Sequence, residues 1–221
     1  MIKLKYFYKT IDLKIKVFIN TRQFTYINTV LGGVYRMVKK ETTKRDIKVV
    51  NIVVSTSLQH DIPLEKMAAT LSNTEYNPEQ FPGLVIRIKE PKTSALIFSS
   101  GKVVCTGARS MDKVEESIKK IIKSLEKINV KITIKPEIKI QNIVASGSVG
   151  MDLNLNTLAM KLENTEYEPE QFPGLVYKLA AAKATFLLFS NGKVVCTGTK
   201  SEKEVHAALD KLIENLRRVK A

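Results

Sequence analysis

The sequence predicts an α+β fold in which two tandem repeats form an antiparallel sheet with helices on one of its faces. Residues 51–107 align with residues 142–198 without a gap at a constant offset of 91, and 32 of the 57 aligned positions are identical. Both repeats carry strand-like and helix-like segments in the same order. A solenoid needs at least about three repeats. Two copies at this long period therefore indicate a fused pair of similar halves, over residues 45–130 and 131–221.

Each repeat opens with a strand pattern, followed by a short helix, a turn-rich loop, three strands and a long helix. The opening strands are expected at 49–58 and 140–149, and the short helices at 63–71 and 154–162. Each loop contains two prolines and a glycine, which favour turns. The next strands are expected at 84–89, 94–98 and 102–106, and at 175–179, 185–189 and 193–197. Ser100-Gly101 and Asn191-Gly192 separate the last two strands, as in a tight hairpin.

The long helices are expected at 110–128 and 201–219, because apolar residues recur there at helical spacing along one face. Ser201 and Glu204 have the spacing of a capping box, and Ser110 is expected to cap the first helix without such a glutamate. Helices on one side of an antiparallel sheet leave its other face free.

Strand alternation separates the two faces of this sheet. If helices cover the face that carries Val103 and Cys105, the other face carries valine, leucine, threonine and phenylalanine with few charges. An exposed apolar face of this kind is typical of a binding surface. The alternative is a sandwich in which both faces are buried. Cys105 and Cys196 are interpreted as buried small hydrophobic residues in either arrangement.

The charge of the chain favours a polyanionic partner. The chain has 221 residues, with 36 Lys and Arg against 22 Asp and Glu, a net charge of +14 and a pI of about 9.7. Nucleic acid or an acidic membrane surface would fit this charge. No apolar run approaches the roughly 18–20 residues of a membrane span, and the N-terminus lacks the continuous apolar core of a signal peptide. We therefore expect a soluble, cytoplasmic protein.

Residues 1–36 match neither repeat and have two interpretations. They contain seven Lys or Arg residues and one Asp, so they could form a basic arm that adds phosphate contacts. Alternatively, the codons of Gly32-Gly33-Val34 can spell a purine-rich ribosome-binding sequence, and Met37 follows at a suitable distance. In that case translation starts at Met37 and residues 1–36 are untranslated leader. The intact mass of the native protein distinguishes the two.

The residues that enzymes need are not present in a credible arrangement. His60 and His206 have no counterpart in the other repeat, and two cysteines cannot complete a structural zinc site. Gly101-Lys102 and Gly192-Lys193 lie in expected hairpin turns and lack the rest of a phosphate-loop motif. We therefore expect no enzymatic activity, no metal and no cofactor.

The repeated blocks together resemble the TATA-box-binding proteins, and more closely the archaeal type, whose halves are alike. The resemblance covers residues 45–221 and rests on VNIVVS against QNIVAS, on EYNPEQFPGL against EYEPEQFPGL, and on the run KEPKTSALIFSSGKVVCTG. It implies one curved antiparallel sheet, a saddle, with the helices on its convex face. It also implies a general transcription initiation factor whose concave face binds the minor groove of double-stranded, A·T-rich promoter DNA.

The resemblance further implies roles for individual residues. Asparagines and threonines would meet base edges near the pseudo-dyad, valines and leucines would pack on the groove floor, and basic residues would contact phosphates. Four phenylalanines would unstack base steps and bend the DNA, a mechanism of which the TATA-box-binding protein is itself the standard example. The implied DNA-binding residues are Asn51, Val53, Phe81, Arg87, Leu96, Phe98, Lys102, Val104, Thr106, Asn142, Val144, Phe172, Lys178, Leu187, Phe189, Lys193, Val195 and Thr197.

The second turn-rich loop keeps an acidic rim that suggests a protein partner. By resemblance, a transcription factor B type protein would dock on Glu168, Glu170 and Gln171, and RNA polymerase would be recruited indirectly. The protein would act as a monomer on DNA and could dimerise through its apolar face when free. The alternative function is a protein-binding adaptor of the same fold that does not engage DNA specifically.

Overall fold

A computed structural model of the protein describes residues 47–220. The basic segment 1–36 and the expected translation start at Met37 lie outside the described residues. Within them, no helix is long and apolar enough to cross a membrane.

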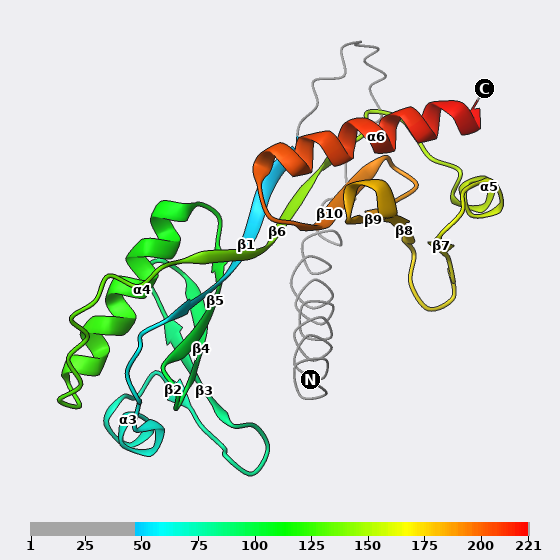
Figure 1. The fold of residues 1–221 in the computed structure, drawn as a ribbon. Coiled ribbons are helices and arrows are strands. Elements are labelled where there is room, and N and C mark those ends of the chain that lie inside the picture. Colours follow the sequence, from blue (N-terminus) through cyan, green and yellow to red (C-terminus); the bar gives the residue numbers. More distant parts are fainter. Residues whose placement is uncertain (1–46, 221) are drawn as a thin grey trace, which may run out of the picture. The chain divides into compact units, whose positions relative to one another are not determined.

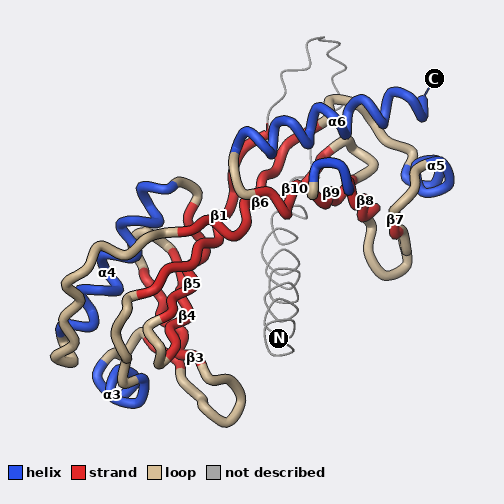
Figure 2. Tube along the Cα trace, viewed as in Figure 1, coloured by secondary structure: helices blue, strands red, loops and turns tan. Residues whose placement is uncertain are grey.

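The two halves contain the same strands and α-helices in the same order, and the second half has the short helix η1 in addition (Figures 1 and 2). The first half comprises β1 (Ile47–Ser57), α3 (Leu64–Thr70), β2 (Thr74–Glu75), β3 (Gly83–Ile88), β4 (Thr93–Phe98), β5 (Lys102–Ala108) and α4 (Met111–Glu126). The second half comprises β6 (Lys139–Ser148), α5 (Leu155–Lys161), β7 (Thr165–Glu166), β8 (Leu175–Leu179), η1 (Ala180–Ala182), β9 (Ala184–Leu188), β10 (Lys193–Thr199) and α6 (Glu202–Lys220). The sequence missed β2, β7 and η1, because two or three residues are too short to show a periodicity.

One antiparallel sheet of ten strands runs through both halves in the order β2-β3-β4-β5-β1-β6-β10-β9-β8-β7. The opening strands β1 and β6 pair with each other at its centre, and Ile52 lies opposite Ile143. These two residues differ by the repeat offset of 91, so the pseudo-dyad of the repeats passes between them. The predicted fold class is therefore confirmed: two pseudo-symmetric repeats share one curved sheet with helices on its convex face (Figure 1).

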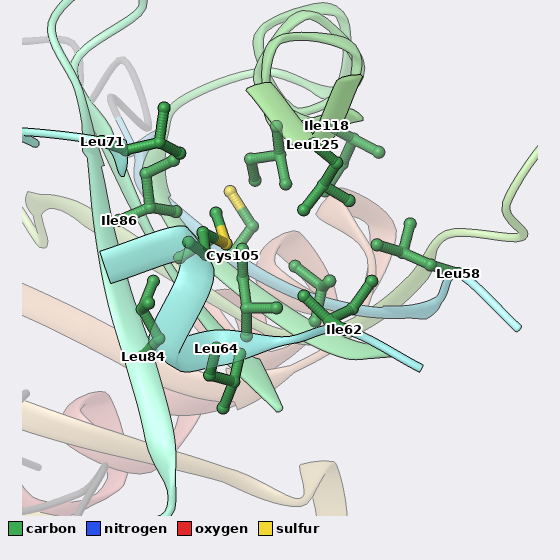
Figure 3. Close-up of a cluster of buried hydrophobic side chains, with 14 of the residues drawn as sticks. Leu58, Ile62, Leu64, Leu71, Leu84, Ile86, Cys105, Ile118 and Leu125 are labelled. Atoms are coloured by element: carbon green, nitrogen blue, oxygen red, sulfur yellow. The ribbon is translucent and has the colours of Figure 1, made fainter. Parts of the chain in front are cut away.

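The cores lie between the sheet and the helices. In the first half Val103 and Cys105 belong to one buried cluster with Ile118, Ile121 and Leu125 of α4. Figure 3 shows Cys105, Ile118 and Leu125 of this cluster. A second cluster joins the equivalent strands to α5 and α6. These clusters identify the face covered by helices as the one predicted. All ten described strands belong to one sheet, so the sandwich alternative is wrong.

The long helices begin where the sequence predicts, but they are capped differently. Ser201 accepts a hydrogen bond from the backbone of Glu204, whose carboxylate accepts one from the backbone of Lys200. Ser110 occupies the N-cap position of α4 without a capping side-chain hydrogen bond, so the expected Ser110 cap is wrong. The third residue of α4 is Lys113, so the reciprocal carboxylate that steadies a capping box is missing there.

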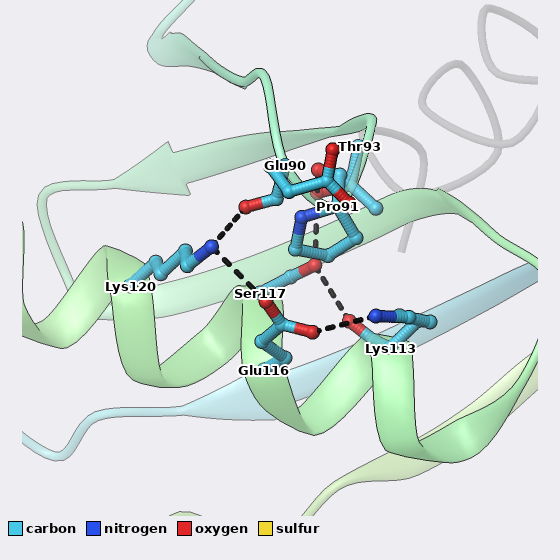
Figure 4. A network of polar contacts seen from close by, with 7 residues as sticks. All are labelled: Glu90, Pro91, Thr93, Lys113, Glu116, Ser117 and Lys120. Carbon is cyan, nitrogen blue, oxygen red and sulfur yellow. Dashed lines mark hydrogen bonds and ion pairs between the residues drawn. The ribbon is translucent and has the colours of Figure 1, made fainter.

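Polar contacts attach α4 to the turn between β3 and β4 (Figure 4). The buried hydroxyls of Thr93 and Ser117 lie 2.9 Å apart, and Thr93 also donates to the carbonyl of Pro91. Lys120 contacts both the carbonyl of Glu90 and the carboxylate of Glu116. These contacts hold the turn against the helix, next to Gly107 of β5.

Candidate nucleic-acid interface

The face of the sheet that carries no core cluster, here called the open face, presents matching rows of side chains in the two halves. Residues directly opposite in an antiparallel sheet share a face. In the first half Leu96 lies opposite Val104, which lies opposite Ser55. In the second half Leu187 lies opposite Val195, which lies opposite Ser146. The predicted leucines and valines are therefore neighbours in space.

The valines of the open face are less exposed than the sequence suggests. Val53, Val104, Val144 and Val195 are 4%, 7%, 4% and 9% exposed, although none belongs to the helix-covered core clusters. Neighbouring strands lie about 4.8 Å apart. A short β-branched side chain in the middle of the sheet is therefore shielded from solvent by the side chains on the adjacent strands. The apolar face expected to be exposed is therefore only partly so: its valines are buried, and Leu96, Leu187 and the four phenylalanines are half-buried.

The two predicted asparagines lie beside the pseudo-dyad. Asn51 is opposite Val144, and Asn142 is opposite Val53. The Nδ2 of Asn51 donates to the hydroxyl of Thr106 at 3.1 Å, and that of Asn142 donates to the hydroxyl of Thr197 at 2.9 Å. The centre of the open face thus consists of two amide–hydroxyl pairs set among valines.

The four predicted phenylalanines form two pairs, one in each half. The rings of Phe81 and Phe98 meet edge to face with centroids 5.9 Å apart, and those of Phe172 and Phe189 do so at 6.0 Å. The glycine at position 83 makes room for the first pair, because a Cβ there would lie 2.6 Å from the ring of Phe81. Each pair therefore acts as one large half-buried apolar side chain projecting from the sheet.

The four residues predicted to contact phosphates fall into two groups: two form ion pairs with glutamates, and two lie at the start of strands. Arg87 is bound to Glu75 and Lys178 to Glu166 in exposed ion pairs at the two ends of the sheet. Lys102 and Lys193 are exposed at the first residue of β5 and β10. Lys102 also borders a groove of about 410 Å³ together with Ser55, Ser57 and Lys139. Lys139 and its repeat equivalent Lys48, related by the offset of 91, are not among the predicted residues.

The comparison with protein families identifies this arrangement. The model of the family described as "Transcription factor TFIID (or TATA-binding protein, TBP)" matches residues 46–128 and 137–219, one match for each half. The chain belongs to the TATA-binding protein family. A protein of Methanocaldococcus jannaschii named TATA-box-binding protein is 52% identical over 174 residues, which are 79% of this chain and 95% of that protein. One of Methanosphaera stadtmanae is 55% identical over 174 residues, 77% of this chain and 93% of that protein.

The solved structure "Methanococcus jannaschii TBP" has the same fold. It matches with a TM-score of 0.74 and 52% identity, covering 78% of this chain and 99% of that one. The resemblance to archaeal TATA-binding proteins is therefore confirmed, and so is the association of this family with transcription initiation.

The acidic loop of this TATA-binding family member is accessible. Glu168, Glu170 and Gln171 are exposed between β7 and β8. The loop is closed by hydrogen bonds from the backbone amides of Gln171 and Phe172 to the carbonyl of Glu168. The first half has Asn77, Glu79 and Gln80 at the equivalent positions and the same turn. The two loops thus share their backbone but differ in charge.

Burial lowers the reactivity of the two cysteine thiols. It raises the pKa of the Cys105 thiol to about 11 and that of the Cys196 thiol to about 12. Both residues are buried on the helix-covered face. They contribute packing to the fold and are not part of the open face.

Proposed function

We propose that this chain is a TATA-box-binding transcription initiation factor that binds the minor groove of promoter DNA with its open face. The carrying observation is the pair of amide donors, Asn51 and Asn142, at the centre of an otherwise apolar surface. A·T base pairs present only acceptors in the minor groove, whereas G adds an amine that projects from the floor. An apolar surface with a few donors therefore fits A·T sequences.

The phenylalanine pairs bend the DNA in this proposal. Phe98 and Phe189 each lie two residues along the chain from the leucine of a leucine–valine row, and Phe98 lies opposite Gly83. Insertion of such a wedge unstacks a base step at a cost of a few kcal/mol, which is offset by the larger surface that the bent duplex covers, as in the minor-groove proteins of which this family is an example. Two wedges related by the pseudo-dyad would kink the site at both ends.

The basic residues hold the phosphates on either side. Lys102 and Lys193 occupy equivalent edge positions, and Arg87 and Lys178 lie further out along the same face. Phosphate contacts add affinity without sequence preference. The protein would bind as a monomer, because its two halves already supply two matched surfaces, and the free protein would dimerise at high concentration.

The same protein nucleates a larger assembly. A transcription factor B type protein docks on Glu168, Glu170 and Gln171, and RNA polymerase follows through that factor. Support comes from the exposure of these three residues and from the negative charge of the two glutamates, which a DNA surface would repel. The first loop has Asn77 in place of Glu168, so the partner can distinguish the halves.

Fluorescence energy transfer across an end-labelled duplex of about 20 base pairs tests DNA binding and bending together. We expect a shortened end-to-end distance on a TATAAA-type site and not on a G·C-substituted one at the same salt. A site with inosine·C pairs, which lack the projecting amine, should be bent like the A·T site. Binding without bending on every duplex would favour the protein-binding adaptor instead.

The docking proposal needs a separate test. Glu168→Lys combined with Glu170→Lys should abolish recruitment of the transcription factor B type protein to the DNA complex while leaving bending intact. The control is Glu79→Lys in the first loop, at the position equivalent to Glu170. Equal losses for the two loops would refute an asymmetric docking site.

A further inference from the structure

Each central asparagine of the open face is held by a third group besides its threonine partner. The backbone N–H of Gly107 donates to the Oδ1 of Asn51 at 2.7 Å, and that of Gly198 donates to the Oδ1 of Asn142 at 2.8 Å. A backbone N–H can only donate, so it determines which end of the amide faces it. The oxygen must turn toward the glycine and the NH2 group away from it.

The glycine N–H groups reach the asparagines because of a bulge in each strand. The register between β1 and β5 shifts between Val54–Cys105 and Ile52–Ala108, and the register between β10 and β6 shifts at the equivalent place. Thr106 and Gly107 therefore share the space opposite Val53. Bulges of this kind redirect groups on a strand. Gly107 has a φ of 103° and Gly198 one of 96°, a backbone conformation that favours glycine.

Packing behind the bulge keeps the glycines in place. A Cβ on residue 107 would lie 3.0 Å from the carbonyl oxygen of Lys92 and 3.1 Å from the Cα of Thr93. Thr93 is the residue that the buried contact with Ser117 holds against α4 (Figure 4). In the second half a Cβ on residue 198 would lie 2.8 Å from the carbonyl oxygen of Lys183. Both sites disfavour a larger residue, because the nearest atoms belong to the backbone and φ is positive.

We infer that the backbone N–H groups of Gly107 and Gly198 orient the amides of Asn51 and Asn142, and so make the centre of the open face present hydrogen-bond donors and no amide acceptor. The glycines are positioning residues. This inference rests on the proposed function, because it concerns how that same face reads DNA. It assigns part of the preference for A·T to two residues that do not themselves face the bases.

The chemistry of this arrangement is selective. Each threonine hydroxyl lies within hydrogen-bonding distance of both Nδ2 and Oδ1 of its asparagine. At least one hydrogen of each Nδ2 is therefore left for an acceptor such as N3 of adenine or O2 of thymine. An amide rotated by half a turn would present its oxygen instead, which could accept a hydrogen bond from the amine of G. Holding the oxygen against the glycine N–H therefore removes the acceptor that would reward a G·C pair.

The orientation can be measured without DNA. In the free protein, NMR should detect scalar coupling across the hydrogen bond between the Gly107 nitrogen and the Asn51 Cγ, and likewise between Gly198 and Asn142. Absence of both couplings would overturn the inference, whether or not the protein binds DNA. The couplings should also disappear in the Asn51→Ala and Asn142→Ala variants, which assigns them.

DNA containing 3-deazaadenine, which lacks the N3 acceptor, tests the consequence. At the two central positions the analogue should weaken wild-type binding roughly 3- to 10-fold per contact, as expected for one lost hydrogen bond. The Asn51→Ala, Asn142→Ala protein should bind more weakly and show no further loss. The Gly107→Ala, Gly198→Ala protein should lose most of the difference in affinity between DNA with adenine and DNA with 3-deazaadenine at the centre. DNA with 3-deazaadenine outside the two central positions is the control.

The outcomes separate the inference from the proposed function. Gly107→Ala, Gly198→Ala protein that keeps a native circular dichroism spectrum and full discrimination would overturn the positioning role. If that variant does not fold, the couplings in the wild-type protein decide the matter. A wild-type protein that shows the couplings but binds A·T and G·C duplexes equally would instead refute the proposed function.

Discussion

The Arg87 guanidinium grips the carboxylate of Glu75 from the neighbouring strand. Its Nε donates to Oε1 at 3.2 Å, and its Nη2 donates to both carboxylate oxygens at 3.0 Å. Lys178 and Glu166 repeat the pair in the second half. If both cations contact phosphates as proposed, each exchanges a carboxylate for a phosphate when DNA binds.

Replacing these glutamates should therefore strengthen DNA binding. For Glu75→Gln and Glu166→Gln we expect an affinity increase of roughly two- to fivefold each, since exposed ion pairs are individually weak. The dependence of the binding constant on salt should become steeper, because a freed cation displaces a counterion from the DNA. Fluorescence anisotropy titrations at several salt concentrations measure both. Glu79→Gln removes the same charge elsewhere, and an equal effect there would indicate a general charge effect.

The phenylalanine pairs should affect the bending of DNA more than the rate of association with DNA. Phe98→Ala or Phe189→Ala removes one ring of an edge-to-face pair, so the remaining ring cannot fill a base step. We expect a smaller end-to-end shortening of the duplex by energy transfer, with an association rate close to that of the wild-type protein. Thermal unfolding checks that the variant is folded. A folded variant that bends DNA as fully as the wild type would contradict wedge insertion.

Lys102→Ala should weaken binding to all duplexes alike. The exposed ammonium at the start of β5 would contact a phosphate, which carries no sequence information. The slope of log affinity against log salt should fall by about one unit. Lys193→Ala is the matched variant in the second half. A loss confined to one DNA sequence would show that Lys102 reads bases instead.

The buried contact between Thr93 and Ser117 should make the first half sensitive to single substitutions. Ser117→Ala leaves the Thr93 hydroxyl in a buried site with one weak acceptor, and should lower the free energy of unfolding by about 1 kcal/mol. The second half has Ala184 and Ala208 at the equivalent positions. Thr93→Ala combined with Ser117→Ala should therefore lower the free energy of unfolding by less than the sum of the two single changes. Urea unfolding of the four proteins measures the coupling.

Because both cysteine thiols are buried, the free energy of unfolding should decrease at alkaline pH. Their thiols have raised pKa values in the folded protein, about 11 for Cys105 and 12 for Cys196, so the unfolded chain releases these protons first. Stability is retained below the unfolded pKa near 8.5 and should fall as the pH rises from about 9 to 11. Cys105→Ala with Cys196→Ala should fall less steeply over that window. Identical pH profiles for the two proteins would contradict the burial of neutral thiols.

Local patterns in the sequence were sufficient to predict much of the fold. The gapless repeat predicted two like halves, and the alternation of Val103, Val104 and Cys105 separated the two faces of the sheet. The helical stripes identified α4 and α6. These predictions succeed because periodicity along one segment reflects which side of that segment is buried.

The contacts between segments needed the tertiary structure. The sequence alone shows an asparagine, a glycine and a ring at given positions, but not that Gly107 donates to Asn51, that Phe81 packs on Phe98 over Gly83, or that Glu75 holds Arg87. It also missed the shielding of Val53 and the missing cap at Ser110. Each of these depends on the register between strands or on a bulge, which is set when distant segments pair and pack. The sequence thus determined which side chains share the open face, and the pairing of the strands decided how those side chains are held.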